Sequence, residues 1–170
     1  MTASNQTFGY RIAILTISDK GAKGEREDLS GNVVAERVLA LGFQQIIRDI
    51  VPDEKEFIAG KMKEWTDGGE IDLIISTGGT GLGPRDVTPE AVRSICDFEI
   101  PGVGEAIRSG TLKYTQMAML SRSTAGVRNG CLIITLPGSP KGVRECLEVI
   151  EPVLVHAMDI TRGRKGHPSH

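Results

Sequence analysis

Residues 71–89 read IDLIISTGGTGLGPRDVTP, an apolar segment followed by a glycine-rich loop and a threonine-proline pair that favours a helix start. Glycines lack a Cβ, so the backbone N–H groups of such a loop can approach phosphate oxygens closely. Asp86, at the end of the loop, adds a carboxylate of the kind that Mg²⁺ uses alongside nucleotide phosphates. The pattern predicts a site for an anion with a metal ion, and a plain strand-to-helix connection is the alternative interpretation.

The loop differs from two common phosphate-binding motifs. A Walker A loop ends in Gly-Lys-Ser/Thr, and no lysine follows the glycines of this loop. A dinucleotide fingerprint needs G-x-G-x-x-G, whereas Gly79, Gly81 and Gly83 alternate with single residues. The sequence therefore argues against both a kinase-type NTPase and a dinucleotide-binding protein.

Three further polar segments follow predicted strands: Ser18-Asp19, Pro52-Asp53 and residues 137–141. Because loops at the carboxyl ends of parallel strands line one crevice, we expect these segments to lie beside the glycine loop. Asp53 and Asp86 would then hold Mg²⁺ together with substrate phosphates.

Each of these carboxylates also has a structural interpretation. Asp53 has the spacing of a helix N-cap, with Glu56 completing a capping box. Asp86 can pair with Arg85 or stabilise a turn, and Asp19 can initiate an Asx turn.

Basic and hydroxyl side chains add candidates for anion binding. Ser139, Pro140 and Lys141 form a helix start with free N–H groups and a cation, although Ser139 can be an ordinary cap. Arg122 and Arg128 flank a predicted strand and could clamp an anion, with solvated surface charge as the alternative. His156 is expected to pack, and the terminal histidines, His167 and His170, are expected to be solvated.

Alternating strand and helix patterns position these residues. Strands are predicted at residues 10–17, 43–51, 73–76, 123–127 and 131–136. Helices are predicted at residues 29–41, 53–65, 88–97, 103–108, 115–120, 140–150 and 152–161, with Thr88 as an N-cap and Gly110 and Pro152 as interruptions.

The order of these elements predicts an α/β fold with helices on both faces of a mostly parallel sheet, that is, three layers. Asn129-Gly130, between the last two strands, is typical of a type I′ hairpin turn, so one antiparallel strand joins the sheet.

Length and composition indicate one domain at residues 10–162, with flexible ends at 1–9 and 163–170. A net charge of −2 and an aromatic content of 4% argue against nucleic-acid binding. Cys96, Cys131 and Cys146 are odd in number and lack metal-site spacing, so we expect core thiols in a reducing compartment. The sequence has no leader pattern or membrane-length apolar run, which predicts a cytoplasmic protein.

Several motifs occur together and in order: TGGTG at 77–81, PRDVTPEA at 84–91, PG at 101–102, MLSR at 119–122, GVR at 126–128 and LPGSP at 136–140. With Ser18-Asp19 and residues 51–54, they closely resemble the Mog-type molybdopterin adenylyltransferases, a family that includes MoaB-like proteins and the G domains of gephyrin and its plant counterpart. The resemblance spans residues 11–162, and the terminal HPSH at 167–170 is similar to the extension of the plant domain.

The resemblance implies a three-layer α/β/α fold, a homotrimer and Mg²⁺-dependent transfer of AMP from ATP to molybdopterin with release of pyrophosphate. By position, Asp53 and Asp86 correspond to catalytic, metal-associated aspartates, and the nucleotide loop corresponds to Gly78, Gly79, Thr80 and Gly81. The pterin and phosphate region corresponds to Ser18, Asp19, Ser121, Arg122, Pro137, Gly138, Ser139 and Lys141. Since the chain lacks a molybdate-inserting domain, a separate insertion enzyme is an expected partner.

Relatives in the MoaB branch and in competence-damage proteins share the glycine loop. A binding module that holds molybdopterin or nucleotide without catalysis is therefore the alternative function. The residues are compatible with the implied reaction: two anionic substrates need charge neutralisation and positioning rather than a protein nucleophile, so the lack of an evident Cys-His or Ser-His-Asp set is expected.

Overall fold

A computed structural model describes residues 9–163 of the chain. The predicted flexible ends, with His167 and His170, lie outside the described residues apart from Gly9 and Gly163. Within residues 9–163, no helix is long and apolar enough to cross a membrane.

The strands are β1 (Arg11–Ile17), β2 (Gln44–Val51), β3 (Leu73–Thr77), β4 (Phe98–Glu99), β5 (Ala125–Arg128) and β6 (Cys131–Leu136). The helices are α1 (Asp19–Ala22), α2 (Leu29–Ala40), α3 (Lys55–Asp67), α4 (Thr88–Ile95), α5 (Pro101–Thr111), the 3₁₀ helix η1 (Gln116–Leu120) and α6 (Pro140–Thr161).

The strands form one six-stranded sheet in the order β2-β1-β3-β6-β5-β4. The first four are parallel neighbours, and β5 runs antiparallel to both β6 and β4. Asn129 and Gly130 connect β5 to β6 with φ values of 48° and 72°, the positive pair that a type I′ turn requires. The predicted fold class and hairpin are confirmed, and the two-residue β4 is the strand that the sequence pattern missed.

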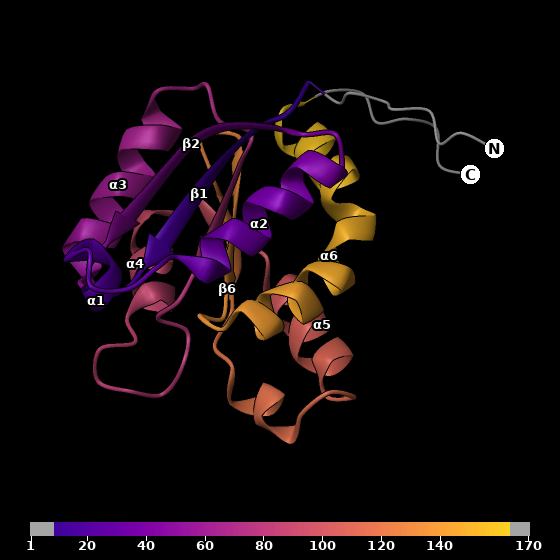
Figure 1. Cartoon of the computed structure of the whole chain (residues 1–170). Helices are drawn as coiled ribbons and strands as arrows, with labels where there is room; N and C mark the ends of the chain where they lie inside the picture. Colours follow the sequence, from indigo (N-terminus) through magenta and orange to yellow (C-terminus); the bar gives the residue numbers. More distant parts are fainter. Residues whose placement is uncertain (1–8, 164–170) are drawn as a thin grey trace.

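Helices cover both faces of the sheet, as Figure 1 shows. One hydrophobic cluster joins α2, α5 and α6 to the sheet, and it includes Val34, Ile107 and Leu147. A second cluster joins α3 and α4 to the other face, and it includes Met62 and Val92. Successive residues of the central strands alternate between the two clusters, so each strand is buried on both faces.

Two predicted interruptions lie inside continuous helices. Pro152 is part of α6, which runs unbroken from Pro140 to Thr161. Proline removes one helical hydrogen bond, but Ile150, Leu154 and Met158 keep a buried stripe across it, and their packing holds the helix together. Gly110 likewise lies within α5, where its lack of a Cβ allows Val149 of α6 to approach.

The strand order identifies where a ligand site belongs. From β1 the chain moves outward to β2 and then returns to β3 on the other side of β1. The carboxyl ends of β1 and β3 thus form a topological switch point, which opens a crevice in sheets of this kind. Because β5 is antiparallel, Ser121 and Arg122 reach the same edge from its amino end, whereas Arg128 lies at the opposite edge.

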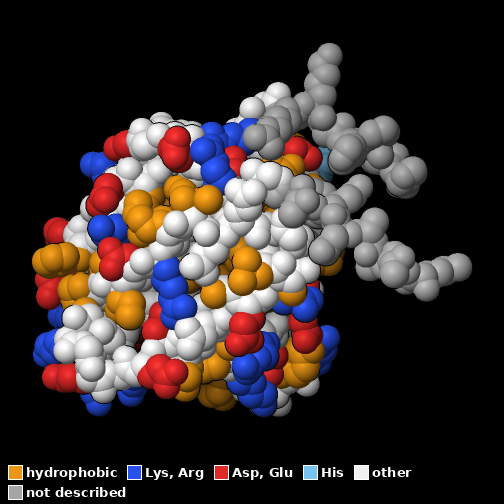
Figure 2. All heavy atoms as spheres, turned by 45° about the horizontal axis from the view of Figure 1, so that its top comes forward, with side chains coloured by type: hydrophobic (Ala, Val, Ile, Leu, Met, Phe, Trp, Pro, Cys, Tyr) orange, Lys and Arg blue, Asp and Glu red, His pale blue; other side chains and the backbone are white. Residues whose placement is uncertain are grey.

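Surface charges are mixed on the face that Figure 2 presents, where basic and acidic side chains are interspersed. That face carries no broad basic patch of the kind that binds a phosphate backbone.

Candidate active site

Two adjoining hollows lie at the carboxyl edge of the sheet. The first, of about 510 Å³, is lined by predicted residues and by their neighbours: Thr16, Ile17, Ser18, Gly21, Arg26, Glu27, Asp28, Ser30, Asp53, Thr77, Gly78, Gly79, Gly138, Ser139 and Pro140. The second, of about 550 Å³, is lined by Gly79, Thr80, Gly81, Leu82, Asp86, Met117, Leu120, Ser121, Pro137, Gly138 and Ser139. Gly79, Gly138 and Ser139 border both, so the two hollows form one cleft with two compartments.

Asp19 and Asp53 connect the ends of β1 and β2 through a reciprocal pair of hydrogen bonds. The Asp19 backbone N–H donates to Asp53 Oδ2 at 2.8 Å, and the Asp53 N–H donates to Asp19 Oδ1 at 3.0 Å. The cap interpretation of Asp53 is wrong: Glu54 is the N-cap residue of α3, and no side chain within residues 9–163 caps that helix. The carboxylate instead faces the first compartment.

The neighbours of Asp53 shift the pKa of its carboxyl. Burial raises the pKa of the Asp53 carboxyl, and the negative charges of Asp19 and Asp86 raise it further. The Asp19 N–H and the Arg85 guanidinium act in the opposite direction. The Asp86 carboxylate is therefore close enough for its negative charge to contribute to the raised pKa of Asp53.

The glycine loop bends sharply where it leaves β3. Gly78 and Gly79 have φ values of 96° and 66°, and a Cβ on either would meet Ile17 O or Thr88 Oγ1 at 2.3 or 2.2 Å. Thr88 is the first residue of α4 and not its N-cap, which is Val87. Its hydroxyl donates to Gly78 O at 2.9 Å and so ties the loop to α4.

Arg122 fastens the glycine loop from the other side. Its Nε donates to Gly81 O at 2.8 Å, its Nη2 donates to Asp86 O at 2.6 Å, and its Nη1 pairs with Glu90. The Asp86 carboxylate folds back onto the loop and accepts a hydrogen bond from the Gly83 N–H at 2.8 Å. With its guanidinium so occupied, Arg122 supports the loop and is not a free clamp for an anion.

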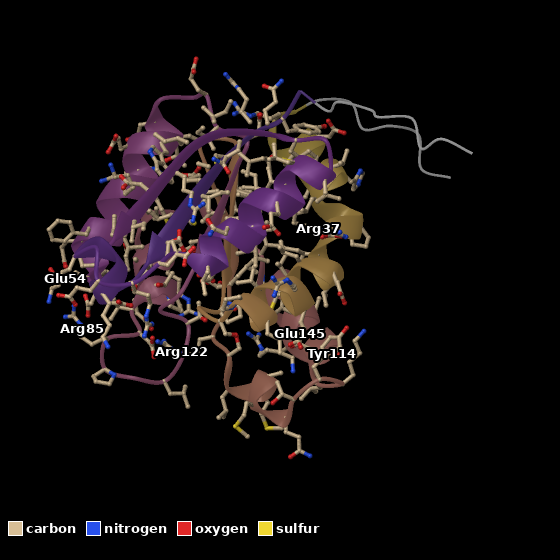
Figure 3. The ribbon with its side chains drawn as sticks, viewed as in Figure 1. Arg37, Glu54, Arg85, Tyr114, Arg122 and Glu145 are labelled. Carbon is tan, nitrogen blue, oxygen red and sulfur yellow. The ribbon has the colours of Figure 1, made fainter. Side chains whose placement is uncertain are left out.

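Arg85 pairs with Asp19, and not with its neighbour Asp86. Its Nη2 and Nε donate to Asp19 Oδ1 and Oδ2 at 2.7 and 3.1 Å, and Glu54 lies 3.9 Å from Nη2. Figure 3 shows Arg85 and Glu54 side by side. The Arg85 guanidinium holds the pKa of the Asp19 carboxyl below its usual range.

The amino end of α6 forms the far wall of the cleft. Ser139 caps α6 by accepting a hydrogen bond from the Gly142 N–H at 3.1 Å, and Pro140 follows it, as predicted. Lys141 lies in an adjoining hollow of about 280 Å³ with Ser121, Pro137 and Ser139. Its ammonium is 3.8 Å from Glu145 Oε1 and is largely exposed.

A polar network around Asp28 is the part of the site that the sequence analysis missed. Asp28 caps α2 through the Gly31 N–H at 2.9 Å and accepts hydrogen bonds from Thr16 Oγ1 at 2.7 Å and from Arg48. Ser30, in the first turn of α2, bonds to Thr77 Oγ1 at 3.2 Å. The aspartate three residues before Gly31 is a recognisable cap, but its strand partners are not adjacent in sequence.

Other candidates lie away from the cleft. Arg128 binds Ile95 O, Thr66 and Asp67 near the β5–β6 turn, so it is structural. His156 is exposed on α6 and does not pack as expected.

The three cysteines are free thiols, and burial raises the pKa of Cys96 to about 11 and those of Cys131 and Cys146 to about 12. These values leave the thiols protonated at neutral pH, as expected of inert core residues.

The carboxylates of the cleft fit a metal ion only when a substrate completes its ligands. Asp53 and Asp86 each use Oδ2 in a hydrogen bond, and each keeps an Oδ1 without a hydrogen bond among the described residues. Within residues 9–163, no group of three or more His, Cys, Asp or Glu side chains is arranged to hold an ion. Mg²⁺ is usually bound by one or two carboxylates with phosphates and water, so this arrangement is compatible with Mg²⁺ carried by a nucleotide.

The fold and the cleft define a class: an α/β protein whose ligand crevice lies at a switch point beside a glycine loop. Residues 13–156 match the family described as probable molybdopterin binding domain, and the chain belongs to this family.

Curated relatives extend over nearly the same length. The molybdopterin adenylyltransferase of Helicobacter pylori strain J99 is 43% identical over 155 residues, which cover 89% of this chain and 88% of the relative. The molybdopterin adenylyltransferase of Pyrococcus furiosus is 35% identical over 158 residues, which cover 90% and 92% of the two chains.

Solved structures agree with the fold. The molybdopterin biosynthesis enzyme MoaB of Thermus thermophilus is 46% identical with a TM-score of 0.86, covering 93% of this chain and 99% of that one. The Mog protein of Mycobacterium ulcerans is 35% identical with a TM-score of 0.85, covering 92% and 99%.

Proposed function

We propose that the protein is a molybdopterin adenylyltransferase of molybdenum cofactor biosynthesis, which uses Mg²⁺ and ATP and releases pyrophosphate. The observation that carries this proposal is the two-compartment cleft, with a glycine loop at its centre and one predicted aspartate in each compartment. Full-length relatives named molybdopterin adenylyltransferase support it.

Two compartments suit a reaction between two anionic substrates. Gly79, Gly138 and Ser139 border both hollows, so groups bound in each would meet there. In the reaction, a terminal phosphate oxygen of molybdopterin attacks the α-phosphorus of ATP. The bond from the α-phosphorus to the bridging oxygen breaks, and pyrophosphate leaves with that oxygen. This chemistry needs alignment and charge neutralisation rather than a protein nucleophile.

Residues of the cleft supply that alignment. The glycine loop offers backbone donors, held in place by Arg122 and Thr88. The α6 amino terminus, with Ser139 and Lys141, favours a phosphate through its dipole and cation. Asp53 and Asp86 would hold Mg²⁺, which when bound neutralises phosphate charge and stabilises the leaving group.

The proposal is tested by pyrophosphate release from Mg²⁺-ATP and molybdopterin, measured for the wild type and for Asp53→Asn and Asp86→Asn. We expect each substitution to lower the rate by about 100-fold or more, the effect of several kcal/mol of lost metal stabilisation. Molybdopterin binding should persist. The matched control is Asp49→Asn, which alters a half-buried aspartate of β2 paired with Lys61 and should leave the rate unchanged.

Normal turnover by both cleft variants would refute the assignment of Asp53 and Asp86. Molybdopterin binding without pyrophosphate release or nucleotide dependence in the wild type would instead identify a binding module.

The proposal extends to assembly and location. We infer a cytoplasmic homotrimer that passes its product to a separate molybdate-inserting enzyme. Exposed apolar side chains support an assembly interface, because several of them gather beside a hollow of about 380 Å³ between η1 and the β4–α5 segment: Leu82, Met119 and Leu120.

A further inference from the structure

Arg85 reaches from the glycine loop to Asp19 at the start of α1, next to Asp53 of the first compartment. Its fork donates two hydrogen bonds to Asp19, which is itself bonded to the Asp53 N–H. The chain of contacts from Arg85 through Asp19 to Asp53 therefore links the glycine loop to the ends of β1 and β2. Figure 3 shows Arg85 next to Glu54, which lies 3.9 Å from its Nη2.

Stability of the fold does not explain this ion pair. The side chains of Arg85 and Asp19 are 57% and 38% exposed, and exposed ion pairs add little to stability. Arg122, by contrast, donates to two backbone carbonyls as well as to a carboxylate. If it moved, the loop carbonyls of Gly81 and Asp86 would lose these hydrogen bonds. Among the described residues, Arg85 donates hydrogen bonds only to the Asp19 side chain, so it can change partner without leaving a backbone carbonyl unpaired.

The charges around Arg85 favour a change of partner from Asp19 to an anionic ligand. Asp19, Asp53 and Glu54 place negative charge beside Arg85, and the positive charge of Arg85 opposes the effect of Asp19 and Asp86 on Asp53. A polyphosphate entering the cleft meets this repulsion. A guanidinium fork binds a phosphate and a carboxylate with the same paired geometry.

We propose that Arg85 is an exchangeable cation, which pairs with Asp19 in the substrate-free protein and transfers its two hydrogen bonds to the phosphates that become pyrophosphate. This inference rests on the proposed function for the identity of the anion. Asp19 then competes with the phosphates for Arg85. Removing the charge of Asp19 should tighten anion binding, whereas removing Arg85 should weaken it.

The test is calorimetric titration of inorganic pyrophosphate in EDTA, which separates Arg85 from any metal contribution. We expect Arg85→Gln to weaken binding about tenfold and Asp19→Asn to tighten it about three- to tenfold, the effect of one charge-assisted contact. Asn keeps an oxygen that can accept the Asp53 N–H. In the double variant Asp19→Asn should no longer raise the affinity for pyrophosphate, because the Arg85 guanidinium that it would release is absent.

A gain that persists in the double variant would show a general charge effect and overturn the exchange. Weakening by both single variants, or no pyrophosphate binding by the wild type, would also overturn it. Arg85→Lys, which keeps the charge but loses the fork, should fall between the wild type and Arg85→Gln. Arg93→Gln is the matched control: Arg93 is 52% exposed and pairs with Glu99 at 2.7 Å outside the cleft.

The outcome for the proposed function is read separately. Opposite effects of the two single variants on pyrophosphate affinity, in a protein that does not adenylylate molybdopterin, would support the exchange and refute the function. If the wild type adenylylates molybdopterin but both single variants weaken pyrophosphate binding, the function would be supported and the exchange refuted. Melting temperatures of all variants should stay close to that of the wild type, since the altered side chains are exposed.

Discussion

At the scale of single residues, Asp28 shows how a side chain of the cleft also supports the fold. Burial raises the pKa of the Asp28 carboxyl, but hydrogen bonds from Arg48, Thr16 and the Gly31 N–H outweigh it, so the pKa lies below its ordinary value. A lowered pKa stabilises the folded state above the unfolded pKa of about 3.9, and this stabilisation is lost as the pH falls through the folded pKa.

Asp28→Asn should therefore destabilise the protein most near neutral pH. We expect a loss of about 1.5–3 kcal/mol at pH 7, the contribution of hydrogen bonds to a charged group. Urea unfolding at pH 7 and below pH 4 should show the difference from wild type shrinking in acid. Asp49→Asn, at a half-buried position of β2, serves as control and should change the free energy of unfolding little. A difference that stays constant with pH would contradict the role of the ionised carboxylate.

Residue partners were the least predictable part of the site. Asp53 and Asp86 were expected at one edge of the sheet because both follow strands, and the structure places them there. The spacing of Asp53 predicted a helix cap because it is a local pattern. In the structure Asp53 accepts a hydrogen bond from the N–H of Asp19, 34 residues away in the sequence. Hydrogen-bond partners this far apart in the sequence are brought together by the strand order, which the spacing of nearby residues does not reveal.

At the scale of elements, the hairpin carries two arginines with different tasks. Arg122 precedes β5 and holds the glycine loop through the carbonyls of Gly81 and Asp86. Arg128 ends β5 at the opposite edge, where it binds Ile95 O and Asp67. Their separation follows from the antiparallel course of β5.

We predict that Arg122→Gln lowers kcat/KM for adenylylation about 10- to 100-fold, because a loop displaced by about 1 Å misaligns the reacting groups. Arg128→Gln should lower the melting temperature and leave kcat/KM unchanged. Steady-state kinetics and thermal melts of both variants provide the check. Equal kinetic losses in the two variants would mean that Arg122 acts through overall stability and not through the loop.

Elements with strong local patterns were predictable, and those decided by packing were not. The Asn129-Gly130 turn and the Ser139 cap appear as expected because each is specified by adjacent residues. The two-residue β4 has no periodicity to detect, and its pairing with β5 alone defines it. Pro152 suggested a helix break, but buried Leu154 and Met158 continue the helix past it.

At the scale of the whole molecule, the strand order places the site and leaves an apolar surface beside it. The sequence predicted parallel strands and helices on both faces, but the order that places β1 between β2 and β3 emerges only from the folded sheet. At the border of the second compartment, Met119 of η1 is 61% exposed and shares a hollow with Leu82 and Leu120. Exposed apolar clusters of this kind commonly mark contacts between subunits.

The homotrimer can be tested on this surface by sedimentation equilibrium, which should give the mass of three 18.3 kDa chains for the wild type. Met119→Glu should shift the mass toward a single chain, because a charge buried in an apolar interface without a partner is strongly unfavourable. Phe57→Glu, which changes a side chain of α3 that is 56% exposed, should leave the trimer intact. A monomeric wild type would refute the assembly, and dissociation by Phe57→Glu alone would move the interface to the α3 face.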